Sequence, residues 1–266
     1  MYKSIIFDIG GVLVDFDPKA YLVDRLCNAE MEEKVYDLTF GSEEWQLLDA
    51  GKLSRYDGNQ RMLEHARAEG CAFEVQGVLD DWMHILRPRL RMLELVRRLK
   101  NHGYCVYYLS NIPQDVLELL TERGVLAQFD GGVASCEVQV NKPDPQIYKA
   151  LLKKYQLKAS ECIFIDDRLE NVQAAFALGF AGIQQLPFLA AKGQVVDLFL
   201  GLGVAQAVHQ IAPGVKVDHH AAQVKHDTFI HTSCLALFRV VGEQLQYTTT
   251  RRCFSTAFCM DTARAA

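Results

Sequence analysis

The chain has 266 residues, of which 50% are hydrophobic and 23% are charged, and its formal net charge is −5. This mixture is ordinary for a folded globular protein, and the acidic balance excludes a basic footprint for nucleic acid or for an anionic membrane. No uncharged apolar run approaches the length of about 18 residues that a transmembrane helix needs, so we expect none.

The first predicted element is a strand at residues 4–10, SIIFDIG, an apolar run that ends on polar residues. Unalternating runs of this kind suit strands that are buried in a parallel sheet. Residues 18–88 hold no strong strand run and contain helical segments such as PKAYLVDRLCN and NQRMLEHARAEG. We therefore predict a helical insertion after the first strand. It is well placed as a lid, because ligands of open α/β sheets bind beyond the carboxyl ends of the strands.

From residue 89 onward, helix-like segments alternate with strand-like runs. Apolar residues recur at helical spacing, and Pro or Gly marks several segment ends, which predicts helices at residues 90–103, 113–124, 145–157 and 170–179. Short apolar runs predict strands at residues 104–111, 131–137 and 162–167, with a weaker one at 181–186. Strands that alternate with helices indicate a parallel sheet in an α/β fold.

Residues 204–266 differ in composition from the rest of the chain. They carry five of the eight His and three of the eight Cys, and six basic against four acidic residues give them a charge of +2, where residues 1–203 carry −7. The His spacings fit no common zinc pattern. We expect a C-terminal appendage of uncertain fold, poorly ordered in part, and we assign it no function.

The N-terminus and the cysteines indicate the compartment. The apolar stretch of MYKSIIFDIGG is short and is interrupted by Asp8, which is not typical of a signal peptide. The eight cysteines are scattered without a CxxC pair, which argues against a zinc ribbon or a redox motif. We therefore expect a cytoplasmic protein, with no nucleic acid or membrane as partner.

Polar residues that can carry chemistry stand at the ends of the predicted strands. The set consists of Asp8, Ser110, Asn111, Asp166 and Asp167, joined by Lys142 in VNKPDP after the third strand. The carboxyl ends of parallel strands share one edge, so these side chains converge there. A carboxylate can attack phosphorus, a hard cation such as Mg²⁺ can neutralise the phosphate, and Lys with a hydroxyl can bind the other oxygens. Any one of them alone could be a helix cap or a solvated loop residue, but together they favour phosphoryl transfer.

Four stretches, FDIGGVLVD, YYLSN, NKPDPQIY and FIDDRLENV, resemble in this order the four motifs of the haloacid dehalogenase-like (HAD) superfamily, over roughly residues 1–187. The helical insertion resembles the cap of the family's first subgroup, which contains phosphatases, dehalogenases, phosphonatases and phosphomutases. The whole pattern is similar to sugar-phosphate phosphatases of the α-D-glucose-1-phosphate phosphatase kind. The resemblance implies a Rossmann-like core at residues 1–17 and 89–203, with a helical cap at 18–88.

The resemblance also implies a role for each residue that matches the motifs. Asp8 would be the nucleophile that forms an aspartyl-phosphate. Lys142 would pair with Asp8 and with the phosphate, which Ser110 would hold with help from the Asn111 amide. The expected substrates are small phosphomonoesters, with sugar phosphates first among them.

A Mg²⁺ site is implied by the same comparison of motifs. Asp8, the backbone carbonyl of Gly10 and Asp167 would bind the ion, and Asp166 would bind it directly or through water. Asn171, four residues after Asp167, is a candidate to support this site or to bind a water.

Gly10 departs from the family pattern, because family phosphatases usually carry a second Asp two residues after the nucleophile. That Asp protonates the leaving oxygen and then activates water, and general acid–base catalysis of this kind contributes about 10²–10⁴-fold. One hypothesis is a phosphatase in which Asp15, Asp17 or a cap residue supplies the proton. The cap stretch FGSEEWQLLDAGKLSRY could face the pocket, but we name none of its residues as a site; Trp45 within it could stack on a sugar or simply pack in the core.

Two further hypotheses follow from the missing acid. A metal-independent 2-haloacid dehalogenase needs no second acid, because halide leaves without a proton, but the paired acids Asp166 and Asp167 argue for a metal. A weakly active or non-catalytic binding protein would keep the pocket without turnover, but the intact Asp8, Lys142 and Asp167 argue against it. We therefore predict a Mg²⁺-dependent hydrolase of small phosphomonoesters.

Overall fold

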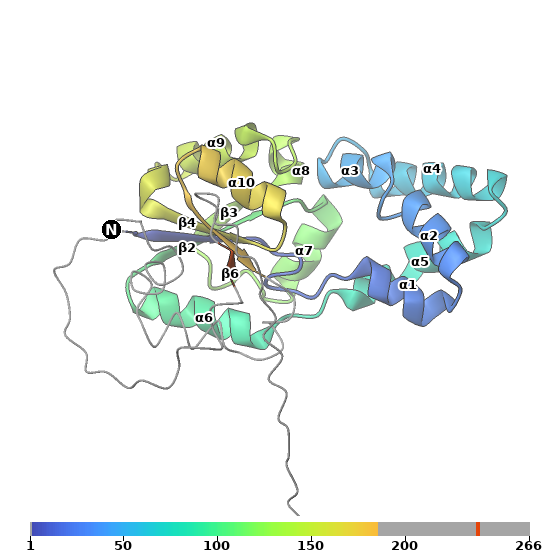
Figure 1. The fold of residues 1–266 in the computed structure, drawn as a ribbon, viewed down its shortest axis with the longest axis horizontal. Helices are drawn as coiled ribbons and strands as arrows, with labels where there is room; N and C mark the ends of the chain where they lie inside the picture. The colour runs from blue at the N-terminus through green and yellow to red at the C-terminus, as the bar shows by residue number, and fades with distance from the viewer. Residues whose placement is uncertain (1, 186–237, 240–266) are drawn as a thin grey trace, which may run out of the picture.

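The computed structural model describes residues 2–185 and 238–239. Its centre is a sheet made of β1 (Ser4–Phe7), β2 (Cys105–Ser110), β3 (Gly131–Ala134), β4 (Cys162–Asp166), β5 (Ala181–Gln185) and β6 (Phe238–Arg239). The strand order is β3-β2-β1-β4-β5-β6, in which β1 to β5 run parallel and β6 is antiparallel to β5 (Figure 1). The predicted α/β fold with a parallel, Rossmann-like sheet is confirmed. The appendage expected at residues 204–266 lies outside the described residues, apart from 238–239.

The sheet is buried on both faces, which explains the unalternating apolar strands. Ile5 and Phe7 of β1 belong to the apolar cluster on one face, whereas Ile6 belongs to the cluster on the other. Helices α6 (Leu90–Asn101) and α7 (Gln114–Glu122) contribute to the first cluster, and α9 (Pro145–Lys154) and α10 (Leu169–Ala177) to the second (Figure 1). The short elements α8 (Ser135–Val138) and η2 (Ala159–Glu161) lie in the connections before α9 and β4.

A helical cap is inserted between β1 and α6, as the sequence predicts. It consists of α1 (Pro18–Leu26), α2 (Ala29–Leu38), α3 (Glu43–Asp49), α4 (Arg55–Ala68), α5 (Ala72–Asp81) and the 3₁₀ turn η1 (Trp82–Ile85). Four of these helices begin at a side chain that accepts a backbone N–H of the first turn: Asp17, Asn28, Ser42 and Ser54. No helix among the described residues has the length and hydropathy needed to cross a bilayer.

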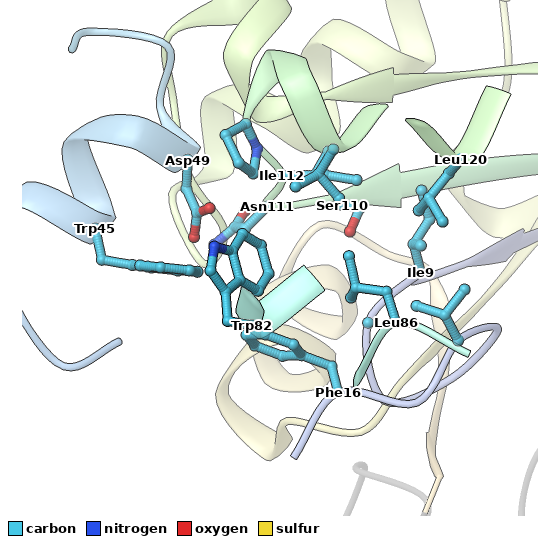
Figure 2. Close-up of a pocket in the computed structure, with 14 residues that line it drawn as sticks. Ile9, Phe16, Trp45, Asp49, Trp82, Leu86, Ser110, Asn111, Ile112 and Leu120 are labelled. Atoms are coloured by element: carbon cyan, nitrogen blue, oxygen red, sulfur yellow. The ribbon is translucent and has the colours of Figure 1, made fainter. Parts of the chain in front are cut away.

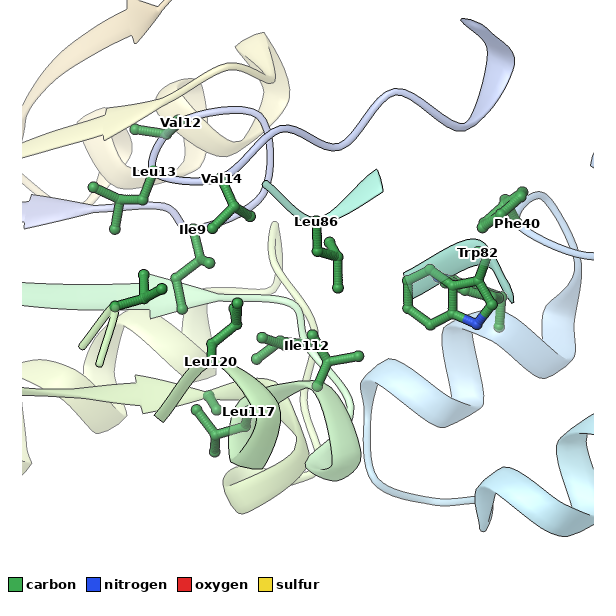
Figure 3. Packing of buried hydrophobic residues seen from close by; sticks show 14 of the residues in the cluster. Ile9, Val12, Leu13, Val14, Phe40, Trp82, Leu86, Ile112, Leu117 and Leu120 are labelled. Atoms are coloured by element: carbon green, nitrogen blue, oxygen red, sulfur yellow. The ribbon is translucent and has the colours of Figure 1, made fainter. Parts of the chain in front are cut away.

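One apolar cluster joins the cap to the sheet. It runs from Ile9 and Leu120, close to the strand ends, through Leu86 to Phe40 and Trp82 in the cap (Figure 3). Ring centroids of Phe40 and Trp45 lie 4.7 Å apart, and those of Trp45 and Trp82 lie 4.8 Å apart. Because these rings pack against one another at the base of the cap, they fix its helices over the strand ends.

Polar contacts also hold α3 and α4 of the cap against the sheet's connections. The Arg55 guanidinium donates to the Asp115 carboxylate of α7 at 2.8 Å, and the Asn141 amide donates to the carbonyl of Gln46 at 2.9 Å. The Ser135 hydroxyl donates to the backbone carbonyl of Asp49, the last residue of α3. These contacts set the C-terminal end of α3 next to the sheet edge that carries the predicted site.

Candidate active site

Asp8 follows the central strand directly, and its backbone N–H donates to the Ile165 carbonyl of β4 at 2.8 Å. Ser110 is the last residue of β2 and Asp166 the last of β4, and both strands pair with β1. All three side chains are buried, with Asp8 7% exposed. The structure therefore brings together the side chains that the strand ends predict.

Lys142 lies between two carboxylates. Its Nζ is 2.8 Å from Oδ1 of Asp8 and donates to Oδ2 of Asp166 at 2.7 Å. The lysine is only 4% exposed. An ammonium removed from water is stabilised only by well-formed ion pairs, so these two contacts explain how the lysine can be buried.

Asn111 positions the backbone of Lys142. Its Oδ1 accepts the Lys142 N–H at 2.7 Å, and its Nδ2 donates to the Lys142 carbonyl at 2.9 Å. Both ends of the amide are therefore engaged, and the expected contact of Asn111 with phosphate stays a prediction that would use its second N–H. The sequence did not reveal this pairing, because Asn111 and Lys142 are 31 residues apart.

Asp166 and Asp167 differ in what surrounds them. Asp166 is fully buried, and it accepts the Arg168 N–H at 2.9 Å and the Asn171 amide at 3.0 Å in addition to the Lys142 ammonium. No described side chain donates to the Asp167 carboxylate, which lies against Gly11: a Cβ on Gly11 would stand 2.2 Å from its Oδ2. Asp166 thus holds Lys142, while Asp167 keeps oxygens available to a ligand.

The site carries more acid than its lysine can balance. Burial raises the pKa of the Asp8 carboxyl and outweighs the lowering by Lys142. Burial together with the charges of Asp8 and Asp166 raises the pKa of Asp167 to about 7. Burial alone would lower the pKa of Lys142, but the carboxylates of Asp166 and Asp8 raise it. A further cation would relieve the repulsion between these carboxylates.

The carboxylates fit such a cation. Asp8, Asp166 and Asp167 each offer an oxygen within 4.8 Å of the others, and no other group of three or more His, Cys, Asp or Glu gathers among the described residues. Hard oxygen donors of this kind suit Mg²⁺. The residues present therefore fit the metal that the sequence predicts.

A pocket opens beside Ser110 and Gly10 (Figure 2). Ten of its fourteen lining residues are apolar: Ile9, Val14, Phe16, Trp45, Trp82, Leu86, Ile112, Pro113, Val116 and Leu120. The polar side chains in its wall are Ser110, Asn111 and Asp49. Most of this wall was not predicted, because it forms only where the cap meets α7; Trp45 packs with Trp82 and also lines the pocket.

Gly10 lies in the pocket wall without a side chain. A Cβ there would meet Phe16 at 3.7 Å, which is an ordinary contact, and its φ lies outside the left-handed region. The backbone at Gly10 would therefore accept a side chain. The predicted contact between its carbonyl and a metal stays a prediction.

Known proteins match most of the described part of the chain. A family model described as a haloacid dehalogenase-like hydrolase matches residues 2–179. The chain is 33% identical over 190 residues to a sesquiterpene phosphatase of Aspergillus oryzae. The aligned residues cover 71% of this chain and 92% of that protein. It is 28% identical over 196 residues to a D-ribitol-5-phosphate phosphatase of Bacteroides thetaiotaomicron, over 69% of this chain and 92% of that protein.

Solved structures share the fold. A HAD family enzyme of Bacteroides thetaiotaomicron, in complex with magnesium and inorganic phosphate, aligns with a TM-score of 0.54 and 21% identity over 70% of this chain and 94% of that one. The L-2-haloacid dehalogenase of Xanthobacter autotrophicus aligns with a TM-score of 0.51 and 20% identity over 68% of this chain and 76% of that one.

Proposed function

Because the chain belongs to the haloacid dehalogenase-like hydrolase family, we propose that it hydrolyses small phosphomonoesters with Mg²⁺, through an aspartyl-phosphate on Asp8. The observation that carries the proposal is the Lys142 ammonium held between Asp8 and Asp166, with Asp167 close by. The phosphatases among its relatives support the reaction class.

Each residue then has a chemical task. An Asp8 oxygen attacks phosphorus, the bond to the ester oxygen breaks, and the alcohol leaves with one added proton. Water next attacks the phosphorus of the aspartyl-phosphate, which releases inorganic phosphate and restores the Asp8 carboxylate. Lys142 and the Ser110 hydroxyl orient the nucleophile and bind the phosphoryl oxygens.

The metal would be held by Asp8, Asp167 and the Gly10 carbonyl, with Asp166 contributing directly or through water. When bound there, Mg²⁺ supplies positive charge to the phosphoryl group and lowers its repulsion from the carboxylates. Asn171, whose amide donates to Asp166, keeps that carboxylate oriented.

The residues that line the pocket support an apolar substrate more than a polyol. Its wall offers few polar groups to sugar hydroxyls, whereas Trp45, Trp82 and Val116 offer apolar surface next to Ser110. A site without matching polar groups binds an apolar group in preference to a polyol, because desolvating unpaired hydroxyls is unfavourable. We therefore place apolar alkyl or prenyl phosphates first and keep sugar phosphates, the expectation from sequence, as the second candidate. The ribitol-5-phosphate phosphatase among the relatives favours the second candidate.

The test is phosphate release from farnesyl phosphate, n-hexyl phosphate, ribitol 5-phosphate and glucose 1-phosphate, each with Mg²⁺ and with EDTA. We expect Mg²⁺-dependent turnover, with higher kcat/KM for the two apolar esters, and no turnover by Asp8→Asn. Higher kcat/KM for ribitol or glucose phosphate would overturn the apolar assignment while leaving the phosphatase intact.

Two other outcomes would replace the proposal. Chloride release from a 2-haloacid in EDTA would identify a dehalogenase. Binding of inorganic phosphate without turnover of any ester would identify a non-catalytic binding protein.

A further inference from the structure

The proposed hydrolysis lacks a proton donor for the leaving oxygen, because Gly10 has no carboxylate. The two acids that follow it in sequence are engaged elsewhere. Asp15 accepts from the Arg89 guanidinium at 2.6 Å and is half exposed, while Asp17 accepts the Ala20 N–H at 3.0 Å as the cap of α1. Neither lines the pocket.

Asp49 of the cap is placed differently. It ends α3, it is the only carboxylate in the pocket wall formed by the described residues, and its side chain points from the cap toward Asn111 (Figure 2). No hydrogen bond or ion pair joins its carboxylate to another described residue. The carboxylate is therefore available to a molecule that enters the pocket.

The backbone of Asp49 is held in register with the strand ends. Its carbonyl accepts the Ser135 hydroxyl, and the same hydroxyl oxygen accepts the Ile112 N–H at 2.9 Å, just beyond Ser110 and Asn111. The next turn of the cap is equally close, because a Cβ on Gly51 would stand 2.5 Å from the Cys136 carbonyl oxygen. These contacts fix the end of α3 relative to the residues that would bind the phosphate.

We propose that Asp49 is the general acid and base that Gly10 cannot be, an inference that rests on the proposed phosphatase activity. In the first step the protonated Asp49 carboxyl gives its proton to the ester oxygen as the bond to phosphorus breaks. In the second step the Asp49 carboxylate takes a proton from the water that attacks the aspartyl-phosphate. The proton returns to Asp49, so the cycle needs no other donor.

The charges around Asp49 suit this task. Burial raises the pKa of Asp49 to about 7, with the carboxylates of Asp8 and Asp115 adding to the rise. The guanidinium groups of Arg55 and Arg168 act in the opposite direction. A general acid–base group is most effective when its pKa lies near the working pH, because both protonation states are then populated.

The experiment compares two esters that differ in their need for a proton. 4-Nitrophenyl phosphate releases a stable phenolate without protonation, whereas n-hexyl phosphate releases an alkoxide that must be protonated. In Asp49→Asn we expect hexanol release to fall by about 10²–10⁴-fold. The same variant should give a rapid nitrophenolate burst, followed by slow turnover because water attack has lost its base. The wild type should hydrolyse both esters, without the loss of hexanol release and without a nitrophenolate burst that precedes slow turnover.

The controls separate a chemical role from a structural one. Asp24→Asn makes the same change at an exposed aspartate of α1 and should leave both rates unchanged. Adding Gly10→Asp to Asp49→Asn should restore hexanol release, since the backbone at Gly10 accepts a side chain.

The outcomes are distinguishable. Unchanged hexanol release in Asp49→Asn, or a fall of equal size in the initial rates of hexanol and nitrophenolate release, overturns the role of Asp49 while the phosphatase stands. If the wild type hydrolyses neither these two esters nor ribitol 5-phosphate or glucose 1-phosphate, the phosphatase itself fails, and the role of Asp49 fails with it.

Discussion

At the scale of single residues, Lys142 controls the electrostatics of the strand-end site. It contacts Asp8 and Asp166 at once, and Asn111 fixes its backbone from both sides. Its positive charge stabilises two buried carboxylates, Asp8 and Asp166, next to each other. Removing it would leave these carboxylates without their ion pairs.

We predict that Lys142→Met destabilises the fold by about 3–5 kcal/mol, because breaking a buried ion pair leaves uncompensated charge. The measurement is urea unfolding of metal-free protein at pH 8. Lys153→Met, at an exposed lysine of α9, serves as control and should change the free energy of unfolding by no more than about 0.5 kcal/mol. Equal stability of the two variants would contradict the prediction.

Asp49 gives a second prediction at this scale, in the dependence of stability on pH. The pKa of Asp49 is about 7 in the folded protein, against about 3.9 for an aspartate in an unfolded chain. The folded state therefore holds a proton that the unfolded state has released. This contribution to stability is full below about pH 4 and is lost as the pH rises through about 7.

Asp49→Asn does not titrate, so its stability relative to the wild type should rise between pH 4 and pH 7 and then level off. We expect a gain of roughly 1–2 kcal/mol at pH 8, smaller than the full pKa shift implies because partial exposure screens the charge. Urea unfolding of metal-free protein at pH 5 and pH 8 measures it, beside Asp24→Asn. A difference that stays constant with pH would show that Asp49 has an ordinary pKa.

At the scale of elements, the docking of α3 decides whether Asp49 reaches the pocket. Gly51, two residues after Asp49, has a φ of +63° and faces the Cys136 carbonyl across the cap boundary. Gly70 has a similar φ of +72°, but a Cβ there would meet nothing within 4 Å. Substituting each glycine therefore separates two effects of an added side chain: backbone strain, which both positions have, and a clash at the boundary between cap and sheet, which only Gly51 has.

We predict that Gly70→Ala loses about 1–2 kcal/mol of stability, because an L-residue is strained at positive φ. Gly51→Ala should lose more, because its Cβ also clashes with the Cys136 carbonyl. Only Gly51→Ala should also lower kcat/KM for n-hexyl phosphate, since its methyl group forces α3 away from α8. Steady-state kinetics and unfolding of both variants provide the test. Equal kcat/KM values would show that this contact does not position α3.

The sequence could predict the strands and the residues at their ends, but not the position of Asp49. The apolar runs placed β1 to β5 and put Asp8, Ser110 and Asp166 at one edge, because parallel strands align their carboxyl ends. The position of Asp49 could not be predicted in this way. It depends on how the cap packs against α7 and α8, through contacts such as Arg55 with Asp115 that join residues 60 positions apart. Periodicity within a helix carries no information about such pairings.

At the scale of the whole molecule, the pocket beside Ser110 is built neither by the sheet nor by the cap alone. Trp45 and Trp82 come from the cap, whereas Ile112 and Val116 come from the segment that follows β2. The pocket exists because one apolar cluster continues across the boundary. The chemistry of the pocket was therefore absent from any single motif. The sequence put sugar phosphates first on family resemblance, and that expectation stays a prediction.

We predict that Val116→Thr lowers the preference for n-hexyl phosphate over ribitol 5-phosphate by roughly tenfold, because a hydroxyl replaces a methyl group in the apolar wall and loses its water when an alkyl chain binds. The measurement is the ratio of the two kcat/KM values. Val96→Thr, a buried valine of α6 outside the pocket, is the matched control. It should cost similar stability and leave the ratio unchanged. A shift of equal size in both variants would mean that the pocket wall does not select the substrate.

Helix α3 carries Trp45 and Asp49 one turn apart, the first in the apolar wall and the second at its polar end. If Asp49 supplies the proton, one helix of this chain determines both which substrate binds and how fast it reacts. Exchanging its cap for that of a relative would transfer both properties at once. Redesign for a new substrate should therefore vary Ile112 and Val116, the lining side chains outside the cap, where a change leaves the proton donor in place.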